Sequence, residues 1–552
     1  MTVLEGKGVC EGYASGKIVF YKNEEYRINK INIEDVNAEL SRFWAAKDTA
    51  IRQLMSLYDS AVTKVGEDNA QIFSIHQMML EDSDYSDSII NIISDQKTNA
   101  EYAVATTSDN FAQIFSSMDD EYMNSRAEDV RDISNRIIKI LTNSESASLL
   151  LHEPSILAAE DLTPSETIQL DKSKILALVT MRGSGTSHTA ILARSMNIPA
   201  IVGLGSALDH TVDGKSAIVD GFTGTVYTEP DIDITTMYTT KMEIENEKRL
   251  KLSELKGKEN VTLDGQKIDI FANVGSVEDA ITAFDNDAGG IGLFRSEFLY
   301  LQAKEYPSED EQFQSYKSVV EKMANKKVII RTLDIGADKQ IDYFKLDKEE
   351  NPAMGFRGIR ICLERKDIFR TQLRAIYRAS AFGNVAIMFP MITDTSEIRD
   401  VKEIVTQVKD KLREEKVSFS DDVELGVMIE TPAAVMVSDL LAKEVDFFSV
   451  GTNDLTQYTL AVDRQNAKLD RYYQPHHKGI LRMLKIIVDN AHNEGIWVGI
   501  CGEIASETDM TETFLAMGID ELSVSPQKIL AVREKVRSID VSKVKQAILD
   551  GL

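Results

Sequence analysis

Cysteine is scarce in this chain: its 552 residues include three, Cys10, Cys362 and Cys501. An odd, scattered set does not build a disulfide framework, which excludes a disulfide-stabilised secreted protein and fits a reducing compartment. The N-terminus, MTVLEGKGVCEGY, lacks the basic start and apolar core of a signal peptide. We therefore expect a cytoplasmic protein.

Long apolar runs and an excess of positive charge are also missing. No segment approaches the ~20 consecutive apolar residues that a transmembrane helix needs, so we expect no membrane insertion. Asp and Glu number 89 against 62 Lys and Arg, which gives a net charge of −27. Nucleic-acid binders need a basic face, so we expect no nucleic-acid partner. An acidic surface can instead attract a basic protein.

The length predicts two to four domains. Apolar residues at three- and four-residue spacing, with hardly any Gly or Pro, predict a helical bundle over residues 21–144, inserted after a first strand. Short apolar runs between glycine turns predict that residues 1–20 and 145–230 together form a compact α/β domain. Residues 231–259 are polar and are expected to form a helical linker.

A strand-then-helix rhythm runs through residues 260–552. Its strand candidates are IDIFANV, GIGLFRSE, KVIIRTLD, VAIMFPMI, ELGVMIETP, FFSVGTND, WVGICGE and ELSVSP. Eight strands with helical crossovers predict a C-terminal (β/α)8 TIM barrel. A doubly wound open sheet is the alternative, but no Gly-x-Gly-x-x-Gly turn follows the first strand. The fold class is therefore multidomain α/β.

One histidine, His188, lies in the run GTSHTAILARSMNIPAIVG, residues 185–203. Hydroxyl and small residues precede an apolar helix there, so backbone N–H groups and the positive helix end can approach an anion. A neutral imidazole in such a loop is a nucleophile that can accept a phosphoryl group. The alternative is a histidine that caps the helix. We favour a covalently phosphorylated residue.

Barrel enzymes hold their active sites where strands end and loops begin. Unusual residues occupy those positions here: Arg295, Arg331, Glu430, Asn453, Asp454 and Cys501. One charged residue beside a strand is ordinary, but so many on one rim are hard to explain as solvated loop ends. The pattern indicates an active site at the mouth of the predicted barrel.

Each residue type at that rim has a chemistry. Glu430 and Asp454 suit Mg²⁺, which bridges carboxylates to a substrate phosphate; the alternatives are a helix cap and a turn residue. The guanidinium groups match phosphate and carboxylate oxygens, and the candidates are Arg295, Arg331, Arg357 and Arg464. The Cys501 thiol can protonate a carbanion-like carbon, although a lone cysteine is more often a buried apolar residue.

The whole chain resembles enzyme I of the phosphoenolpyruvate-dependent sugar phosphotransferase system. The runs that carry the resemblance include DLTPSETIQL, GTSHTAILARS, GIGLFRSEFLY, RTLDIGADK, VMIETPAA, SVGTNDLTQYTLAVDR and VGICGE. The family transfers the phosphoryl group of phosphoenolpyruvate to its own histidine and then to a histidine of the small phosphocarrier HPr, releasing pyruvate. This is the first step of sugar uptake by that system.

The resemblance implies roles for individual residues. His188 is the phosphorylated residue, Cys501 protonates the enolate of pyruvate, and Glu430 and Asp454 ligate Mg²⁺. Phosphoenolpyruvate is held by Arg295, Arg331, Asn453 and Arg464, with help from Arg357. The bundle docks HPr through Phe73, His76, Met78, Met79 and Arg126, and Thr167 and Asp129 orient the His188 ring. A homodimer through the barrel is also expected from the family.

The chain departs from the family pattern near the histidine and in one barrel loop. Gly183-Ser184 stands where two glycines are usual, Gly185 where a basic residue often follows, and Phe356 where tryptophan is common. Pyruvate phosphate dikinases and phosphoenolpyruvate synthases have similar domains, but 552 residues leave no room for their ATP-binding domain. A non-catalytic scaffold that binds HPr is the other alternative, and the intact set of reactive residues weighs against it.

Overall fold

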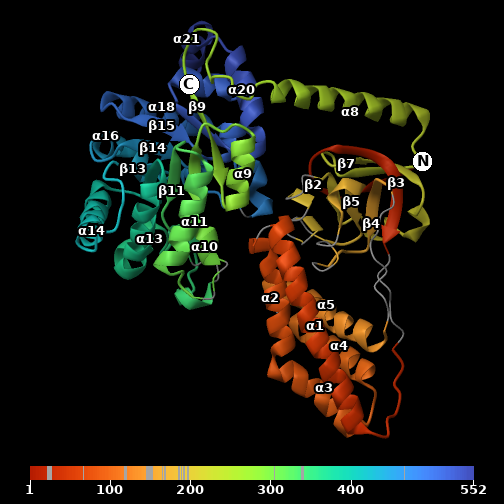
Figure 1. Ribbon diagram of the computed structural model, residues 1–552. Helices are drawn as coiled ribbons and strands as arrows, with labels where there is room; N and C mark the ends of the chain where they lie inside the picture. The colour runs from red at the N-terminus through yellow and green to blue at the C-terminus, as the bar shows by residue number, and fades with distance from the viewer. Residues whose placement is uncertain are drawn as a thin grey trace. The chain divides into compact units, whose positions relative to one another are not determined.

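The computed structural model describes most of the chain (Figure 1). The described residues are 1–21, 28–65, 67–116, 121–143, 153–163, 166, 170–183, 187, 189–190, 193–194, 198–301, 303, 305–336, 341–464 and 466–552. Two compact units divide the chain, Met1–Glu247 and Lys248–Leu552. The first contains a helical bundle and an α/β domain, and the second contains a barrel. The predicted multidomain α/β fold class is confirmed.

Five helices form the bundle of the first unit: α1 (Val36–Val65), α2 (Glu67–Glu81), α3 (Ser83–Gln96), α4 (Ala100–Ser116) and α5 (Glu121–Leu141). Helix α4 packs along α5, and α1 along α2. On α5, Val130, Ile133 and Ile137 recur at helical spacing and are buried in the bundle core, which explains why the helix docks by that face. Asp82 accepts N–H bonds at the start of α3.

The α/β domain is built on one mixed sheet in the order β1-β8-β7-β3-β4-β5-β6-β2. The strands before the bundle are β1 (Thr2–Glu5), β2 (Lys7–Cys10) and β3 (Tyr13–Tyr21). Those after it are β4 (Ser155–Ala159), β5 (Ile175–Thr180), β6 (Ala200–Val202), β7 (Ser216–Asp220) and β8 (Thr225–Thr228). Strands β3, β4, β5 and β6 run parallel, and the remaining pairs are antiparallel.

The first ten residues differ from our expectation of a single N-terminal strand. They form two strands separated by Gly6, and these pair with opposite edges of the sheet: β1 with β8, and β2 with β6. A tight approach of backbones makes this possible. A Cβ atom at Gly224, where φ is +72°, would lie 2.4 Å from the carbonyl oxygen of Gly6. Only glycine fits there.

Helix α8 (Ile232–Ser253) follows β8 and lies within residues 231–259, for which we expect a helical linker. The buried Tyr238 fixes its beginning to the α/β domain, because the Tyr238 hydroxyl donates a 2.8 Å hydrogen bond to Asp220 and the ring packs against Tyr13 and Tyr227. Beyond its end, the buried Arg533 of the barrel binds the carbonyl oxygen of Leu255 at 2.9 Å. The linker is thus anchored separately in each unit.

The second unit is a closed barrel of eight parallel strands, which excludes the doubly wound alternative. Its strands are β9 (Asp269–Val274), β10 (Ile291–Arg295), β11 (Val328–Arg331), β12 (Val385–Phe389), β13 (Glu424–Ile429), β14 (Phe447–Val450), β15 (Trp497–Ile500) and β16 (Glu521–Val524). All eight runs proposed from the sequence contain one of these strands.

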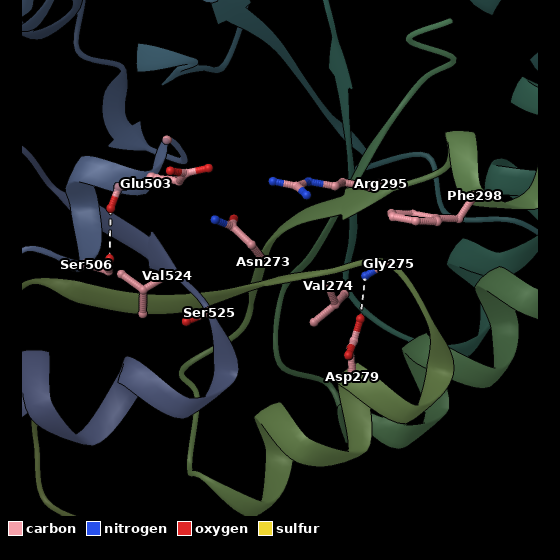
Figure 2. A pocket seen from close by; sticks show the side chains of 11 residues that line it. Asn273, Val274, Gly275, Asp279, Arg295, Phe298, Glu503, Ser506, Val524 and Ser525 are labelled. Carbon is pink, nitrogen blue, oxygen red and sulfur yellow. Dashed lines mark hydrogen bonds between the residues drawn. The ribbon is translucent and has the colours of Figure 1, made fainter. Parts of the chain in front are cut away.

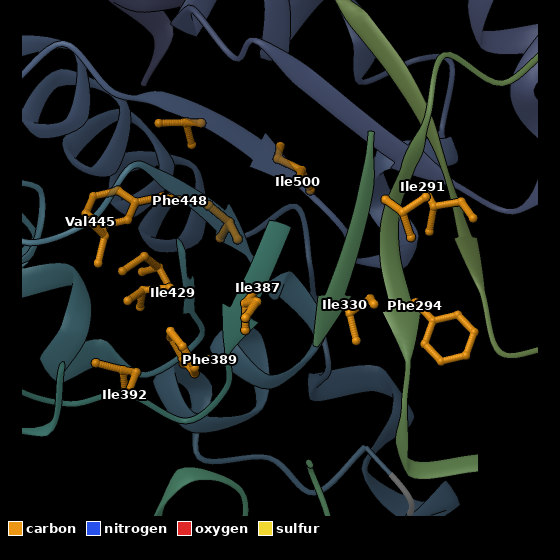
Figure 3. Close-up of a cluster of buried hydrophobic side chains, with 14 of the residues drawn as sticks. Ile291, Phe294, Ile330, Ile387, Phe389, Ile392, Ile429, Val445, Phe448 and Ile500 are labelled. Carbon is orange, nitrogen blue, oxygen red and sulfur yellow. The ribbon is translucent and has the colours of Figure 1, made fainter. Parts of the chain in front are cut away.

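Helices surround the barrel: α9 (Val277–Asp285), α10 (Glu297–Leu301), α11 (Glu309–Lys322), α12 (Ile359–Glu364), α13 (Lys366–Ala379), α14 (Thr395–Glu414), α15 (Pro432–Met436), α16 (Ser438–Leu441), α17 (Thr452–Leu460), α18 (Lys478–Asn493), α19 (Thr511–Met517), α20 (Ile529–Ser538) and α21 (Val541–Gly551). Capping boxes begin α11 and α14. Figure 3 shows apolar side chains that the strands contribute to the main core of this unit, among them Phe294, Ile387 and Phe448.

The interior of the barrel has an apolar part and a polar part. Buried apolar residues that form a cluster separate from the main core are Leu293, Ile329, Ala386, Met388, Met428, Phe447 and Cys501. Glu521 on β16 is 2% exposed, and its Oε1 has no hydrogen-bond partner among the described residues. Burial, and next the nearby Asp269, raise the pKa of Glu521 well above 4.5. This carboxyl group therefore destabilises the fold when it must ionise.

Glu521→Gln is expected to flatten the dependence of stability on pH. The pKa of Glu521 is higher in the folded than in the unfolded state, so the folded protein binds this proton more tightly. The stabilisation that this proton gives the folded state is fully present below the unfolded pKa of about 4.5 and is lost as the pH rises. Between about pH 5 and pH 8 the wild type should lose stability that the variant keeps.

Urea unfolding of both proteins at the two pH values measures this difference. Glu512→Gln on α19 is the matched control, because Glu512 is partly exposed and pairs with Lys535 at 3.1 Å. Identical pH slopes for the wild type and Glu521→Gln would show that Glu521 ionises normally in the folded protein.

Candidate functional site

The reactive residues predicted at strand ends do gather at the carboxyl end of the barrel. Arg295 and Arg331 are the last residues of β10 and β11, and Glu430 and Cys501 directly follow β13 and β15. Asn453 and Asp454 lie in the first turn of α17, which follows β14. Because all eight strands are parallel, these ends share one rim.

Buried carboxylates hold two of the arginines. Arg331 contacts Glu297 at 2.5 Å and Asp334 at 3.0 Å, and Arg357 contacts the same Asp334 at 3.0 Å. Arg331 and Arg357 are 7% and 8% exposed. Burial is the largest single influence on the pKa of both guanidinium groups, and it lowers the pKa. The nearby carboxylates together outweigh burial, so the pKa of each group is raised. Both arginines therefore stay charged and in fixed orientations.

Sequence reasoning missed Glu297 and Asp334. Both follow a predicted arginine within three residues, in the runs RSE and RTLD. A buried arginine needs a counter-charge, so an acidic residue one turn or loop away was the available signal.

Glu430 and Asp454 are the candidate cation ligands. Neither takes the alternative role considered for it, because Thr431 caps α15 and Asp454 lies inside α17. The N–H group of Met391 donates a 2.6 Å hydrogen bond to Glu430 Oε1. Glu430 Oε2 and Asp454 Oδ1 are both buried and have no hydrogen-bond partner among the described residues, and Asp454 Oδ1 makes only long ion pairs, at 3.7 Å with Arg464 and 3.8 Å with Arg357. Two orphaned carboxylate oxygens fit a hard divalent cation.

The electrostatics of this pair agree with a cation site. Burial, and next the charge of Asp454, raise the pKa of Glu430 to about 8. Two buried carboxylates together are unfavourable without a positive charge between them. No group of three or more His, Cys, Asp or Glu side chains with metal-binding geometry occurs in the described part of the chain. Water and substrate oxygens would complete the shell, as is usual for Mg²⁺.

Asn453 and Arg464 extend the site on the side of β14. The Asn453 amide group exchanges hydrogen bonds with Glu503, accepting one from the Glu503 N–H at 3.2 Å. Arg464 lies 3.7 Å from Asp454, with 35% of its side chain exposed. It is therefore the most accessible of the arginines paired with carboxylates at this rim.

A pocket of about 230 Å³ opens at the rim beyond Glu503, between the ends of β15, β16, β9 and β10 (Figure 2). Figure 2 shows Arg295 and Asn273 directed into it from neighbouring strands, with Glu503 across from them. Val274, Gly275, Asp279, Phe298, Gly502, Ser506, Val524 and Ser525 complete its lining. The pocket places one cationic side chain beside amide and carboxylate groups, which suits a small polar ligand.

Cys501 belongs to the apolar cluster inside the barrel, with the charges of Arg331 and Glu430 nearby. Its side chain is buried, and its Sγ donates to the carbonyl oxygen of Val450 at 3.6 Å. Burial raises the pKa of the Cys501 thiol to about 12, against a lowering by the neighbouring Ser449 hydroxyl. The thiol therefore holds its proton at neutral pH, as a proton donor must.

His188 and Thr167 lie outside the described residues. Among the predicted docking residues, Phe73 and His76 belong to the interior of the bundle, Met79 and Arg126 are partly exposed, and Met78 is 46% exposed. The buried His76 lies 3.2 Å from Asp129 and 3.4 Å from Asp132. Arg126 also pairs with Asp129, at 2.9 Å. The surface offered by this set consists mainly of Met78, Met79 and Arg126, and docking stays a prediction.

None of the described helices is both long and apolar enough to cross a bilayer. The closed barrel, with arginines and orphaned carboxylate oxygens at one rim, defines a barrel enzyme site for a small, multiply charged anion.

Comparison with known proteins identifies the family. Three family models match in succession: the N-terminal domain of PEP-utilising enzymes over residues 5–126, their mobile domain over 151–224, and their PEP-binding domain over 249–541. The phosphoenolpyruvate-protein phosphotransferase of Priestia megaterium is 41% identical over 98% of this chain and 95% of its own length. That of Haemophilus influenzae is 43% identical over 98% and 95%.

A solved structure, an NMR solution structure of Enzyme I, is 35% identical and covers 44% of this chain and 99% of its own, with a TM-score of 0.38. Given the near-complete coverage of the sequence relatives, the chain belongs to the phosphoenolpyruvate-protein phosphotransferases, the enzyme I family, as its motifs indicated.

Proposed function

We propose that the protein transfers the phosphoryl group of phosphoenolpyruvate to His188 and then to a histidine of HPr, releasing pyruvate. This would be the first step of sugar uptake by the phosphotransferase system, in the cytoplasm. The observation that carries the proposal is the rim of the barrel, where buried arginines, two orphaned carboxylate oxygens and a protonated thiol converge. That set matches the phosphate, the carboxylate and the reacting carbon of phosphoenolpyruvate.

Each group at the rim has a task in this reaction. Arg295 and Arg331 would bind the phosphate, with Arg357 assisting, because planar guanidinium groups match its oxygens. Asn453 and Arg464 would orient the carboxylate. Glu430 and Asp454 would hold Mg²⁺, which when bound neutralises charge on the phosphoryl oxygens. The Cys501 thiol would deliver its proton to the methylene carbon of the enolate, completing pyruvate.

The domain that carries His188 must alternate between the barrel and the bundle-bound HPr. Helix α8 suits a hinge, because Tyr238 anchors its beginning to the α/β domain and Arg533 anchors the chain just beyond its end to the barrel. We place one hinge there and a second near residue 150. HPr docking would use the exposed face of the bundle around Met78, and the net charge of −27 favours a basic partner. We also propose a homodimer through the barrel, and no nucleic-acid partner.

Incubation with Mg²⁺ and radiolabelled phosphoenolpyruvate tests the proposal. We expect label that is acid-labile and base-stable, the behaviour of phosphohistidine, and its transfer to added HPr. A parallel incubation uses labelled ATP. Label from ATP would indicate a dikinase, and no label from either compound on a folded protein would indicate a scaffold.

Cys501→Ala is expected to lower steady-state pyruvate formation by about 10²–10⁴-fold, the usual contribution of a positioned general acid. Alanine leaves the arginines in place, so phosphoenolpyruvate should bind with unchanged affinity. Cys362→Ala is the matched control, because Cys362 is also a buried free cysteine but lies in α12. Pyruvate formation within threefold of the wild type would mean that another group protonates the enolate.

A further inference from the structure

The barrel interior beneath Cys501 contains polar groups that the reaction described above does not use. They are Asn273 on β9, Ser449 on β14, and Glu521 and Ser523 on β16. Ser449, Glu521 and Ser523 are each at most 2% exposed. Both hydroxyl oxygens and Glu521 Oε1 lack a hydrogen bond of good geometry within the described residues. We call these four residues the polar wall of the barrel.

Glu521 fills space that two glycines leave open. In the parallel register it stands beside Gly499 of β15 on one side and Asp269 of β9 on the other. A Cβ atom at Gly499 would lie 2.0 Å from Glu521 Oε2, and one at Gly292 would lie 2.7 Å from Oε1. Any side chain at either glycine would displace the carboxyl group. The strands around Glu521 therefore accommodate its carboxyl group inside the barrel.

The polar wall leads from Glu521 toward the thiol. A Cβ atom placed on Gly292 would lie 2.3 Å from Ser523 Oγ and 2.7 Å from Glu521 Oε1. The hydroxyl group and the carboxyl group are therefore neighbours. Ser449 lies beside the thiol and lowers its pKa, and Glu521 is close enough to raise it. The Asn273 amide group donates 3.0 Å hydrogen bonds to the carbonyl oxygens of Cys501 and Ser523. These two bonds link the end of β15, which Cys501 follows, to β16, which contains Glu521.

The opposite end of this route reaches solvent. Asp269, in register with Glu521, is the first residue of β9 and is exposed at the amino end of the barrel. Lys327 is the cation near Glu521, and it is engaged by Glu424 at 2.8 Å. Burial and the charge of Asp269 raise the pKa of Glu521, whereas Ser523 and Lys327 lower it, and the net direction is well upward. Burial and Asp269 therefore favour the protonated form of Glu521, and the nearby cation Lys327 is already paired with Glu424.

We propose that Glu521 returns a proton to Cys501 after each turnover by way of the Ser449 hydroxyl, which stands in register with Glu521 on the other side of Gly499. This inference rests on the proposed function. The thiol S–H bond breaks as its proton forms a C–H bond with the enolate, which leaves a thiolate. The O–H bond of Glu521 then breaks, the Ser449 hydroxyl turns to accept this proton while it gives up its own, and the S–H bond reforms. The Glu521 carboxylate recovers its proton from solvent near Asp269. Glu521 acts through Cys501 and does not touch the substrate.

Comparison of one turnover with many turnovers tests this route. A single transfer to His188 needs only the proton that Cys501 already holds. In Glu521→Gln we therefore expect single-turnover phosphohistidine formation within twofold of the wild type and an unchanged KM for phosphoenolpyruvate. Steady-state kcat for pyruvate formation with HPr should fall at least about tenfold. Imidazole buffer should restore part of it, because a small acid can supply the missing proton. Glu512→Gln on α19 is the control, and thermal unfolding verifies that each variant is folded.

The outcomes separate the two proposals. A folded Glu521→Gln variant with wild-type kcat would overturn the route through Glu521. So would equal losses in single and multiple turnover without recovery in imidazole, because those indicate a displaced site. A wild-type protein that takes no label from phosphoenolpyruvate would overturn the proposed function, and the proton return with it.

Discussion

His188→Ala is expected to abolish covalent labelling by phosphoenolpyruvate. Alanine has no nucleophilic nitrogen, and a phosphoryl group on imidazole has no substitute acceptor in the proposed reaction. The loss should be complete within detection, whereas binding of phosphoenolpyruvate to the barrel should persist, because none of the rim residues changes. Acid-quenched labelling measures the first effect, and equilibrium binding of labelled phosphoenolpyruvate in the presence of Mg²⁺ measures the second.

His210→Ala is the matched control for that variant. His210 belongs to the same α/β domain and is exposed at the start of a short 3-10 helix, His210–Val212. Its replacement should leave labelling unchanged. Label retained in His188→Ala with the acid lability of phosphohistidine would assign the acceptor to another histidine and refute the role of His188.

Glu430→Gln should produce the second largest loss. The substitution keeps the shape of the side chain but removes the negative charge that a cation needs. Loss of groups that merely support a metal ligand costs about 10–100-fold, so loss of a direct ligand should lower kcat/KM by at least about 100-fold. The saturating Mg²⁺ concentration should also rise. Pyruvate formation measured over a range of Mg²⁺ concentrations reports both effects.

The stability of Glu430→Gln should change in the opposite direction. The wild-type carboxyl group is fully buried beside Asp454 and its pKa is about 8, so at neutral pH it must take up a proton on folding, a cost that a neutral amide does not have. We expect an equal or higher Tm in the absence of Mg²⁺. Glu424→Gln is the control on the same strand, where Glu424 pairs with Lys327 at the other end of the barrel. Wild-type kcat/KM at every Mg²⁺ concentration would exclude Glu430 as a ligand.

The barrel was predictable because its signals are local. Each strand is a short apolar run such as VAIMF, and each is followed by a helical pattern. The rim residues can be predicted from the same pattern, because a polar residue at the carboxyl end of a predicted barrel strand must lie at the rim. The order of residues alone therefore places Arg295, Arg331, Glu430 and Cys501 at the rim.

Other features depend on contacts that no local pattern reveals. Asp334 neutralises both Arg331 and Arg357, and this pairing needs the barrel to bring two loops together. The burial of His76 between two carboxylates of another helix could not be predicted either. A helical pattern of apolar residues does not show which polar residues the helix also buries. The two short strands of the first ten residues could not be predicted, since their partners are 190 or more residues away.

Those first ten residues have a consequence for the order in which the protein forms during synthesis. Thr2 pairs with Thr228, so the ribosome releases one partner long before it makes the other. The helices of the bundle, Val36–Leu141, depend mainly on contacts close in sequence and can assemble while translation continues. The α/β domain must wait for β8, with its N-terminal strands unpaired in the meantime. A bulky N-terminal fusion should therefore delay the maturation of the α/β domain and leave the bundle largely unaffected.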